Sequence, residues 1–319
     1  MQTPMTLLNR REFALGLLAA AAAWRTAEAA GKLRATIGGV RIGAITYSFR
    51  EVPRTPGKDF LETGLESCVA SGLGVAELWA TMVQPDQPLL PRGGQYEIDP
   101  ANAAMVKARE DIRRWRIDTP ASYWQGIRRR FDKAGIELIG YSLTLADDFT
   151  DEEIDKTLRA VRAMGIRDLG TNQTRVSMGK RVVPFAEKHG VRLCFHNHAN
   201  VDHANEVATI ASMEEVLAQS KQYMINLDVG HFVAANLDPV AFIAKYHDRI
   251  SYLHLKDRKR DNGPNMPWGQ GDTPLKEVLQ LVKKERYPIP CLIEYEYKGE
   301  QSPLVEVGKC MDYIRQALA

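Results

Sequence analysis

The feature that most constrains the fold is a regular alternation of two kinds of segment. Eight short runs of apolar and β-branched residues recur along the chain, and most are followed by a polar turn and then by a stretch with helical patterning. These runs are Val40–Tyr47, Val75–Trp79, Ile136–Leu143, Ile166–Leu169, Val191–His196, Met224–Asp228, Ile250–Leu255 and Pro290–Tyr295. Strands that alternate with helices pair in parallel, because each crossover needs a helix. Eight such units predict a closed α/β fold, the (β/α)8 TIM barrel, rather than an open sheet.

Local signals indicate where helices begin and end. Thr119-Pro120, Asp238-Pro239 and Thr273-Pro274 each place a capping side chain before a proline that suits the first helical turn. Gly135 and Gly190 each follow a helical stretch and precede a strand, which is where a left-handed cap belongs. These positions support the division into strand and helix units.

One connection, residues 81–119, is much longer than the others. It is rich in proline and glycine at first and takes helical patterning from about Asn102 to Arg116. Long insertions between a strand and its helix are usually functional. We expect this insertion to form a lid or a contact in a homo-oligomer, and the sequence leaves both open.

The first 29 residues resemble an export signal. Asn9-Arg10-Arg11-Glu12-Phe13 precedes the apolar run Ala14–Ala23, and Ala27-Glu28-Ala29 has the small-x-small pattern that signal peptidase cuts. The paired arginines are typical of the twin-arginine (Tat) pathway. The apolar run is shorter than the ~20 residues that span a bilayer. We therefore predict a periplasmic protein with no stable membrane insertion, whose single catalytic domain comprises residues 30–319.

Composition narrows the classes of partner. Lys and Arg total 42, Asp and Glu total 40, and the formal net charge is +2. Proteins that bind nucleic acid over a wide surface usually carry a stronger basic excess, so we expect no nucleic-acid partner. The four cysteines have no CxxC spacing, which argues against a zinc knuckle or a redox motif. The sequence leaves open whether Cys68 and Cys310 form a disulfide after export.

Residues suited to chemistry follow four successive predicted strands. His196, Asp228, His254 and Glu294 stand at the ends of the last four runs, and a barrel builds its site at these ends. A buried carboxylate or imidazole without a partner is costly, and a divalent cation would compensate several at once. Two imidazoles and two carboxylates suit Mn²⁺, Co²⁺ or Zn²⁺. The sequence therefore predicts a divalent metal ion as cofactor.

Further polar residues share faces with these four. Alternate residues of a strand point the same way, so His198 can accompany His196, Lys256 can accompany His254, and Glu296 can accompany Glu294. Each pattern alone has an ordinary interpretation: a His pair in the core, a solvated Glu pair, or an exposed charge run from Lys256 to Arg260. Their joint occurrence at four strand ends favours one site.

The same motifs resemble the sugar phosphate isomerase/epimerase superfamily, the xylose isomerase-like TIM barrels. The motifs are Phe195-His196-Asn197-His198, Leu227-Asp228-Val229-Gly230-His231, His254-Leu255-Lys256-Asp257, Ile293-Glu294-Tyr295 and the glycine loop Trp268-Gly269-Gln270-Gly271-Asp272. The resemblance covers roughly residues 40 to 318 and implies a metal held by His196, Asp228, His254 and Glu294. It further implies that His231 touches a substrate oxygen and that His198 supports the metal site or acts on substrate.

The resemblance also implies the substrate contacts and the type of chemistry. The residues expected to face a small sugar or glycoside are Tyr47, Glu77, Trp79, His231, Trp268 and Glu296. The expected reaction is enolisation, in which the metal polarises a sugar carbonyl and Glu294, or a nearby His such as His198, takes the adjacent proton. Lys256 is a candidate to hold a hydroxyl or a leaving oxygen.

One departure bears on the reaction. Ketose 3-epimerases carry a Glu where this chain has His196, and they use two carboxylates on opposite faces of the substrate carbon. Here Glu294 keeps that role, with Glu296 nearby on the same strand.

The preferred hypothesis is a metal-dependent sugar isomerase or epimerase. The alternative is a 3-keto-glycoside lyase or hydratase that works by β-elimination, which an exported location favours. A non-catalytic carbohydrate-binding barrel is less favoured, and so is a phosphodiesterase like endonuclease IV, because no His precedes His189.

Overall fold

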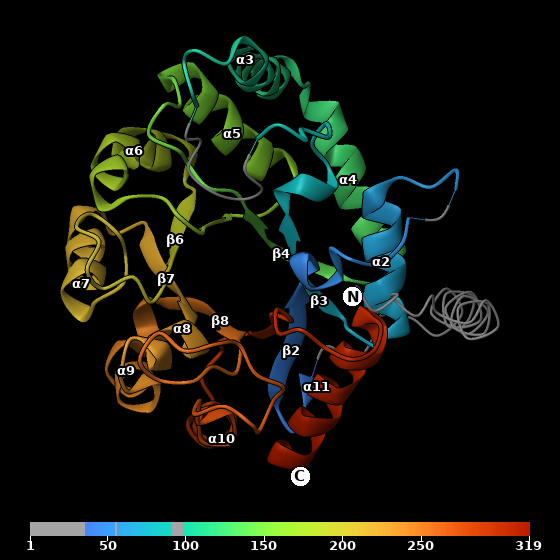
Figure 1. Cartoon of the computed structure of the whole chain (residues 1–319), viewed down its shortest axis with the longest axis vertical. Helices are drawn as coiled ribbons and strands as arrows, with labels where there is room; N and C mark the ends of the chain where they lie inside the picture. The colour runs from blue at the N-terminus through green and yellow to red at the C-terminus, as the bar shows by residue number, and fades with distance from the viewer. Residues whose placement is uncertain (1–35, 55, 91–97) are drawn as a thin grey trace, which may run out of the picture.

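Eight parallel strands form a closed barrel, which the computed structural model describes over residues 36–54, 56–90 and 98–319 (Figure 1). The barrel strands are β2 (Val40–Ile45), β3 (Val75–Trp79), β4 (Glu137–Ser142), β5 (Asp168–Thr171), β6 (Arg192–His196), β7 (Tyr223–Asp228), β8 (Ile250–Leu255) and β9 (Cys291–Ile293). Each strand pairs with the next, and pairing of β2 with β9 closes the ring. The predicted (β/α)8 barrel is confirmed, and each of the eight runs overlaps one strand. The export signal predicted for residues 1–29 lies outside the described residues.

Helices lie outside the ring of strands (Figure 1). They are α2 (Phe60–Ala70), α3 (Ala103–Asp118), α4 (Ala121–Lys133), α5 (Asp151–Ala163), α6 (Val176–His189), α7 (Ile210–Gln219), α8 (Val229–Ala234), α9 (Pro239–Tyr246), α10 (Leu275–Glu285) and α11 (Pro303–Leu318). The short elements are strand β1 (Thr36–Ile37), antiparallel to β2, and the 3-10 turns η1 (Thr46–Phe49), η2 (Ala80–Met82) and η3 (His247–Arg249). The apolar faces of the outer helices pack against the barrel strands, so the main core lies between the helices and the strands.

Several predicted helix boundaries are confirmed. Asp238 accepts hydrogen bonds from the first turn of α9, with Pro239 as the first helical residue. Gly190 ends α6 with a φ of 61°, and Gly135, just after α4, has a φ of 71°, the left-handed region that glycine enters without steric cost.

The other two predicted caps are wrong. Helices α4 and α10 begin one residue after the proline, and neither has a side-chain cap. Thr119 Oγ1 donates instead to the Trp115 carbonyl at the end of α3, at 2.5 Å. Thr273 Oγ1 accepts from the Arg258 backbone, at 3.0 Å. Both hydroxyls found partners outside the helix that they precede.

The helical half of the 81–119 insertion is fixed to the outer layer. The predicted helix forms as α3, which lies outside α5 in Figure 1. Fully buried Glu153 of α5 accepts from Arg109 at 2.8 Å and from Arg116 at 2.7 Å. Arg109 also reaches Asp148 at 2.7 Å. A buried carboxylate between guanidinium groups therefore docks α3, while a lid or oligomer role for the insertion stays a prediction.

An ion pair closes the amino-terminal end of the barrel. Asp168 begins β5 and Arg192 begins β6, and the two side chains share two hydrogen bonds of 2.6 and 2.7 Å. Ser251 of β8 donates to the same carboxylate. These contacts tie β5, β6 and β8 together at this end, whereas sites in barrels of this architecture lie at the opposite end.

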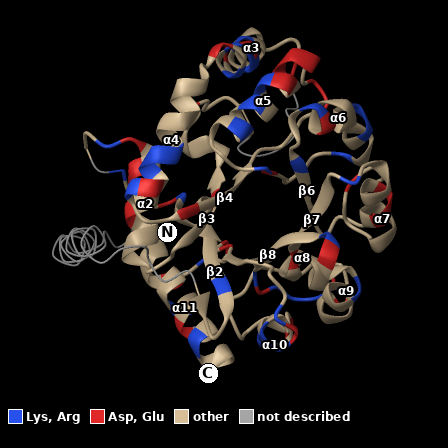
Figure 2. Cartoon of the chain, turned by 180° about the vertical axis from the view of Figure 1, so that it is seen from behind, with Lys and Arg blue, Asp and Glu red and all other residues tan. Residues whose placement is uncertain are grey.

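The outer surface is charged, and the cysteines are buried. Figure 2 shows acidic and basic residues interspersed along the outer helices. Within the described ranges, no helix has the length and apolarity needed to cross a membrane. Cys68 and Cys310 are both buried free thiols, so the disulfide left open by the sequence is not formed.

Candidate active site

Four side chains from consecutive strands meet at the carboxyl end of the barrel. His196 ends β6, Asp228 ends β7, His254 lies in β8 and Glu294 directly follows β9. One ligand atom from each lies within 4.8 Å of the others, and all four residues are buried. The parallel register brings them to one level: His196 pairs with Asn226, Asp228 with His254, and the Glu294 backbone donates to Leu255.

The hydrogen bonds of these residues leave atoms available for a cation. Asp228 Oδ1 accepts from the backbone N–H of His231 at 2.6 Å and so caps α8. Asp228 Oδ2 and His196 Nδ1 are buried and have no hydrogen-bond partner among the described residues. Buried polar atoms are normally paired. Asp228 Oδ2 does form an ion pair with Lys256 Nζ, at 3.3 Å. A buried imidazole nitrogen without a hydrogen bond beside a buried carboxylate oxygen fits a divalent cation with nitrogen and oxygen ligands.

His254 lies between two carboxylates. Its Nδ1 is 2.9 Å from Glu294 Oε2, and its Nε2 is 2.6 Å from Glu77 Oε2. Burial lowers the pKa of His254, but the charges of Glu294 and Glu77 outweigh it and raise the pKa to about 10. Glu77, predicted to face the sugar, has no exposed surface, and its other oxygen accepts from the Tyr252 hydroxyl at 2.6 Å.

His196, His198 and His231 form a second cluster at the same rim. Their ring centroids are 4.8 to 5.6 Å apart, and burial lowers the pKa of each, so they are neutral imidazoles. They also bring ligand atoms within 4.8 Å of one another. However, both nitrogens of His231 face cationic side chains, Lys256 Nζ at 3.0 Å and Arg258 Nη1 at 2.6 Å. The set with two carboxylates therefore suits a cation better.

Lys256 links the carboxylates of the site. Its Nζ is 2.7 Å from Glu296 Oε2, 3.3 Å from Asp228 Oδ2 and 3.4 Å from Glu294 Oε2, and only 2% of the side chain is exposed. Burial lowers the pKa of Lys256, but the negative charges of Asp228, Glu294 and Glu296 raise it above its ordinary value. The group is therefore an ammonium at neutral pH.

Of the remaining residues predicted to contact the substrate, two join the hydrogen bonds around Lys256 and two tryptophans pack against other aromatic rings. The Tyr47 hydroxyl donates to Glu296 Oε1 at 3.0 Å, so both residues belong to the Lys256 network. Trp79 is 3% exposed and lies edge-on behind Tyr47, with ring centroids 5.1 Å apart. Trp268 packs edge-on against Tyr313 of α11, at 5.8 Å, and its indole N–H has no partner among the described residues.

Sequence reasoning gave no role to three residues that the structure places in the site. Asn197 brackets the backbone of Asp228, accepting from its N–H at 2.9 Å and donating to its carbonyl at 3.1 Å. Arg258 contacts His231, and Asn265 donates to Glu296 at 3.3 Å. Asn197 stands between the two histidines of its motif, which was a usable signal. Arg258 belongs to a run of charges that is typical of a solvated surface.

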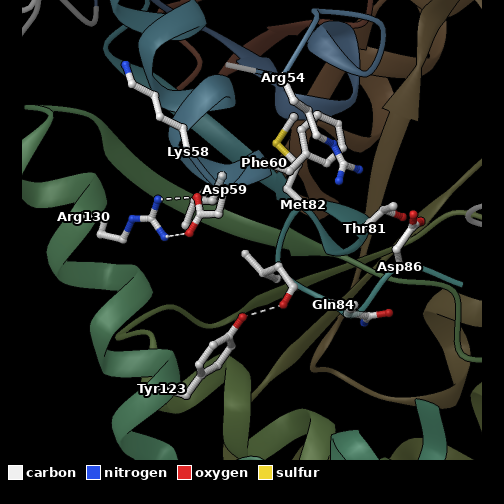
Figure 3. Close-up of a pocket in the computed structure, with 12 residues that line it drawn as sticks. Arg54, Lys58, Asp59, Phe60, Thr81, Met82, Gln84, Asp86, Tyr123 and Arg130 are labelled. Atoms are coloured by element: carbon white, nitrogen blue, oxygen red, sulfur yellow. Dashed lines mark hydrogen bonds and ion pairs between the residues drawn. The ribbon is translucent and has the colours of Figure 1, made fainter. Parts of the chain in front are cut away.

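A separate cavity of about 240 Å³ lies between the start of α2, the residues after β3, and α4 (Figure 3). Asp59, the cap of α2, makes two hydrogen bonds of 2.6 Å to Arg130 at its edge. None of the predicted site residues lines it. Phe60, which does, is edge-on to Trp79 at 6.4 Å, and Trp79 is edge-on to Tyr47 at 5.1 Å.

Comparison with known proteins places this arrangement in a family. A family model described as "Xylose isomerase-like TIM barrel" matches residues 101–317, more than half of the chain. Among curated proteins, an inosose dehydratase of Clostridium beijerinckii is 31% identical over 103 residues, which are 32% of this chain and 28% of that protein. An inosose dehydratase of Mesomycoplasma hyopneumoniae is 25% identical over 175 residues, which are 47% of this chain and 56% of that protein. The chain thus spans at most about half the length of these relatives.

Solved structures share the fold over nearly the whole barrel. The E. coli 3-keto-D-glucoside 4-epimerase YcjR has a TM-score of 0.57 and 10% identity, covering 87% of this chain and 99% of that one. The IolI protein with a bound zinc atom has a TM-score of 0.58 and 12% identity, covering 87% and 97%. At these identities the likeness concerns the fold alone.

Proposed function

The chain belongs to the xylose isomerase-like TIM barrel family, and from this premise we propose that it is a divalent-cation-dependent sugar isomerase or epimerase. The proposed reaction moves a proton next to a carbonyl group of a small carbohydrate. The observation that carries the proposal is the buried meeting of His196, Asp228, His254 and Glu294, in which His196 Nδ1 and Asp228 Oδ2 make no hydrogen bond.

These four residues would hold the cation. Their two imidazoles and two carboxylates suit Mn²⁺, Co²⁺ or Zn²⁺, and the related IolI structure contains zinc. When bound, such a cation supplies a Lewis acid that polarises a substrate carbonyl and acidifies the neighbouring C–H.

The proton would be moved by one member of this set, Glu294, and by residues beside it. Glu294 is ionised, because Lys256 and His254 lower its pKa well below the ordinary value although burial raises it, so its carboxylate can accept a proton. His198 is a second acceptor, since it is neutral and its side chain makes no hydrogen bond within the described residues. The Lys256 ammonium and His231 would hold substrate hydroxyls.

The alternative is a 3-keto-glycoside lyase or hydratase. Two observations support this alternative. Lys256 lies within 3.4 Å of Glu294 and within 2.7 Å of Glu296, so a proton donor for a leaving oxygen stands beside the proposed base. The curated relatives are inosose dehydratases, which are named for the loss of water. Both reactions share the first proton removal.

One experiment separates these functions. The Mn²⁺-loaded protein is incubated in D₂O with a ketose and with a 3-keto-glycoside, and the sugars are followed by NMR. Deuterium gain without release of the aglycone supports the isomerase or epimerase, and gain with release supports the lyase. Absence of exchange in any sugar, with cation bound, would contradict both and leave a carbohydrate-binding barrel. Glu294→Gln should abolish exchange and leave the fold intact.

We also propose export to the periplasm by the twin-arginine pathway. The support is the sequence Asn9-Arg10-Arg11-Glu12-Phe13 and the apolar run that follows it. Cell fractionation tests this directly. We expect the chain in the periplasmic fraction and the double variant Arg10→Lys, Arg11→Lys in the cytoplasm. An unchanged distribution of the variant would contradict the proposal.

A further inference from the structure

A buried carboxylate lies directly behind one proposed cation ligand. Glu77 is on β3 and His254 is on β8, three strands away around the barrel, and their side chains meet in its interior. Glu77 Oε2 is 2.6 Å from His254 Nε2, and Glu77 Oε1 accepts from the Tyr252 hydroxyl at 2.6 Å. Glu77 and His254 have no exposed surface. Both oxygens of Glu77 are therefore engaged by protein groups, and neither is free to receive a sugar hydroxyl.

The barrel interior is shaped to admit this carboxylate. A Cβ atom on Gly170 of β5 would lie 2.2 Å from Glu77 Oε1 and 2.6 Å from the Tyr252 hydroxyl oxygen. A Cβ atom on Gly140 of β4 would lie 3.3 Å from the same hydroxyl. Two neighbouring strands thus carry glycine where a larger residue would displace the pair. A buried carboxylate costs free energy unless protein groups pair with it, so the groups that pair with Glu77 indicate its role.

The two nitrogens of His254 have different surroundings. Nδ1 lies against Glu294, a member of the proposed ligand set. Nε2 lies 2.6 Å from Glu77, which is outside the set, and 3.3 Å from the Asn226 side-chain amide, so Glu77 is its nearer partner. A histidine ligand offers a lone pair from one nitrogen and donates N–H from the other, and a carboxylate on the N–H side fixes the tautomer and strengthens the ligand.

We propose that Glu77 is a positioning residue: it holds the N–H on Nε2 of His254 and so directs Nδ1 to the cation. The Tyr252 hydroxyl holds Glu77 in turn. This inference rests on the cation site of the proposed function, but it assigns Glu77 to the support of a ligand and not to the sugar.

Zn²⁺ affinity tests the proposal without any assay of activity. The dissociation constant for Zn²⁺ is measured by competition with a chelator for the wild-type chain and for Glu77→Gln. We expect the dissociation constant of the variant to rise by about 10- to 100-fold, as for other carboxylates that support a metal-bound histidine. Glu306→Gln is the matched control. Glu306 is also buried and also accepts from a tyrosine hydroxyl, that of Tyr297 at 2.8 Å, but it contacts none of the four ligands.

The tautomer of His254 gives a second readout that a merely structural role would not move. In ¹⁵N NMR spectra of the Zn²⁺-loaded wild type, we expect a proton on Nε2 and the metal on Nδ1. The reverse assignment, or an unchanged affinity in Glu77→Gln beside a wild type that binds Zn²⁺, would overturn the inference and leave the proposed function standing. A wild type that binds no Zn²⁺ would overturn both. Since the tautomer measurement uses only the wild type, it decides the question even if Glu77→Gln does not fold.

Discussion

Asp228 caps the helix that carries His231, because its Oδ1 accepts the backbone N–H of His231 at 2.6 Å. The other oxygen of the same carboxylate makes no hydrogen bond, lies 3.3 Å from Lys256 Nζ, and belongs to the proposed cation site. One side chain therefore fixes the first turn of α8 and offers a ligand atom. The Asp-x-x-His spacing is what makes both possible, since an N-cap side chain reaches the third residue beyond it.

This double role can be separated by substitution. Asparagine also caps helices well, so Asp228→Asn should keep the thermal stability of the wild type within a few degrees while Zn²⁺ binding is lost. Asp228→Ala should lose binding and also about 1 kcal/mol of stability, the usual value of a cap. Calorimetric unfolding and Zn²⁺ titration of both variants provide the check. Equal stability of the two variants would contradict the capping role.

The carboxylate of Glu153 should be essential for docking of α3. Removing it takes away the buried carboxylate that accepts from both Arg109 and Arg116. Breaking a buried ion pair by removing one partner typically costs about 3–5 kcal/mol. We expect Glu153→Gln to lower the free energy of unfolding in urea toward that range. Asp151→Asn serves as the control, because Asp151 is also on α5 but forms an exposed ion pair, with Arg181 of α6. This substitution should change the free energy of unfolding by less than about 1 kcal/mol. Similar effects of both substitutions would contradict the argument.

Stability in acid should depend on Asp155. Burial raises its pKa, but hydrogen bonds from Lys188 and His189 and the charge of Arg159 lower it to about 2. A carboxylate with a depressed pKa in the folded state stabilises it above the ordinary value of 3.8, and this contribution disappears as the pH falls towards 2. The melting temperature of Asp155→Asn should therefore fall less than that of the wild type between pH 4 and 2. The exposed Asp248→Asn should follow the wild type. Parallel curves for Asp155→Asn and the wild type would rule out this contribution.

Glu77 approaches Gly170 so closely that a methyl group added at Gly170 should destabilise the fold. In Gly170→Ala the added atom would overlap Glu77 Oε1, and the carboxylate and Tyr252 would have to move. Overpacking of this kind usually costs about 1–3 kcal/mol. We expect that loss of stability in urea together with weaker Zn²⁺ binding. Gly308→Ala, on α11 with open space around it, is the control. Unaltered Zn²⁺ affinity in Gly170→Ala would show that displacement of Glu77 does not reach His254.

The barrel was predictable because its signal is local and repeated. Each strand run is short and apolar, and the carboxyl ends of parallel strands meet at one edge, so His196, Asp228, His254 and Glu294 could be expected together. Lys256 followed from its shared face with His254.

The contacts that escaped prediction are those made across the barrel or by loops. The pairing of Glu77 with His254 joins residues 177 apart in sequence, and no periodicity reports which interior side chains meet. Arg258 lies in a charge run whose usual place is the solvated surface, and only the path of the loop after β8 brings it to His231. The Thr119 hydroxyl binds the end of the preceding helix and the Thr273 hydroxyl binds the loop after β8, so neither caps the helix that follows it.

The position of a bound cation tests the central claim most directly. Crystals of the Zn²⁺-loaded chain would be measured at the zinc absorption edge, and an anomalous difference map would locate the ion. We predict one strong peak in contact with His196, Asp228, His254 and Glu294. A map with no peak, or with the peak held by His198 and His231 instead, would contradict the account.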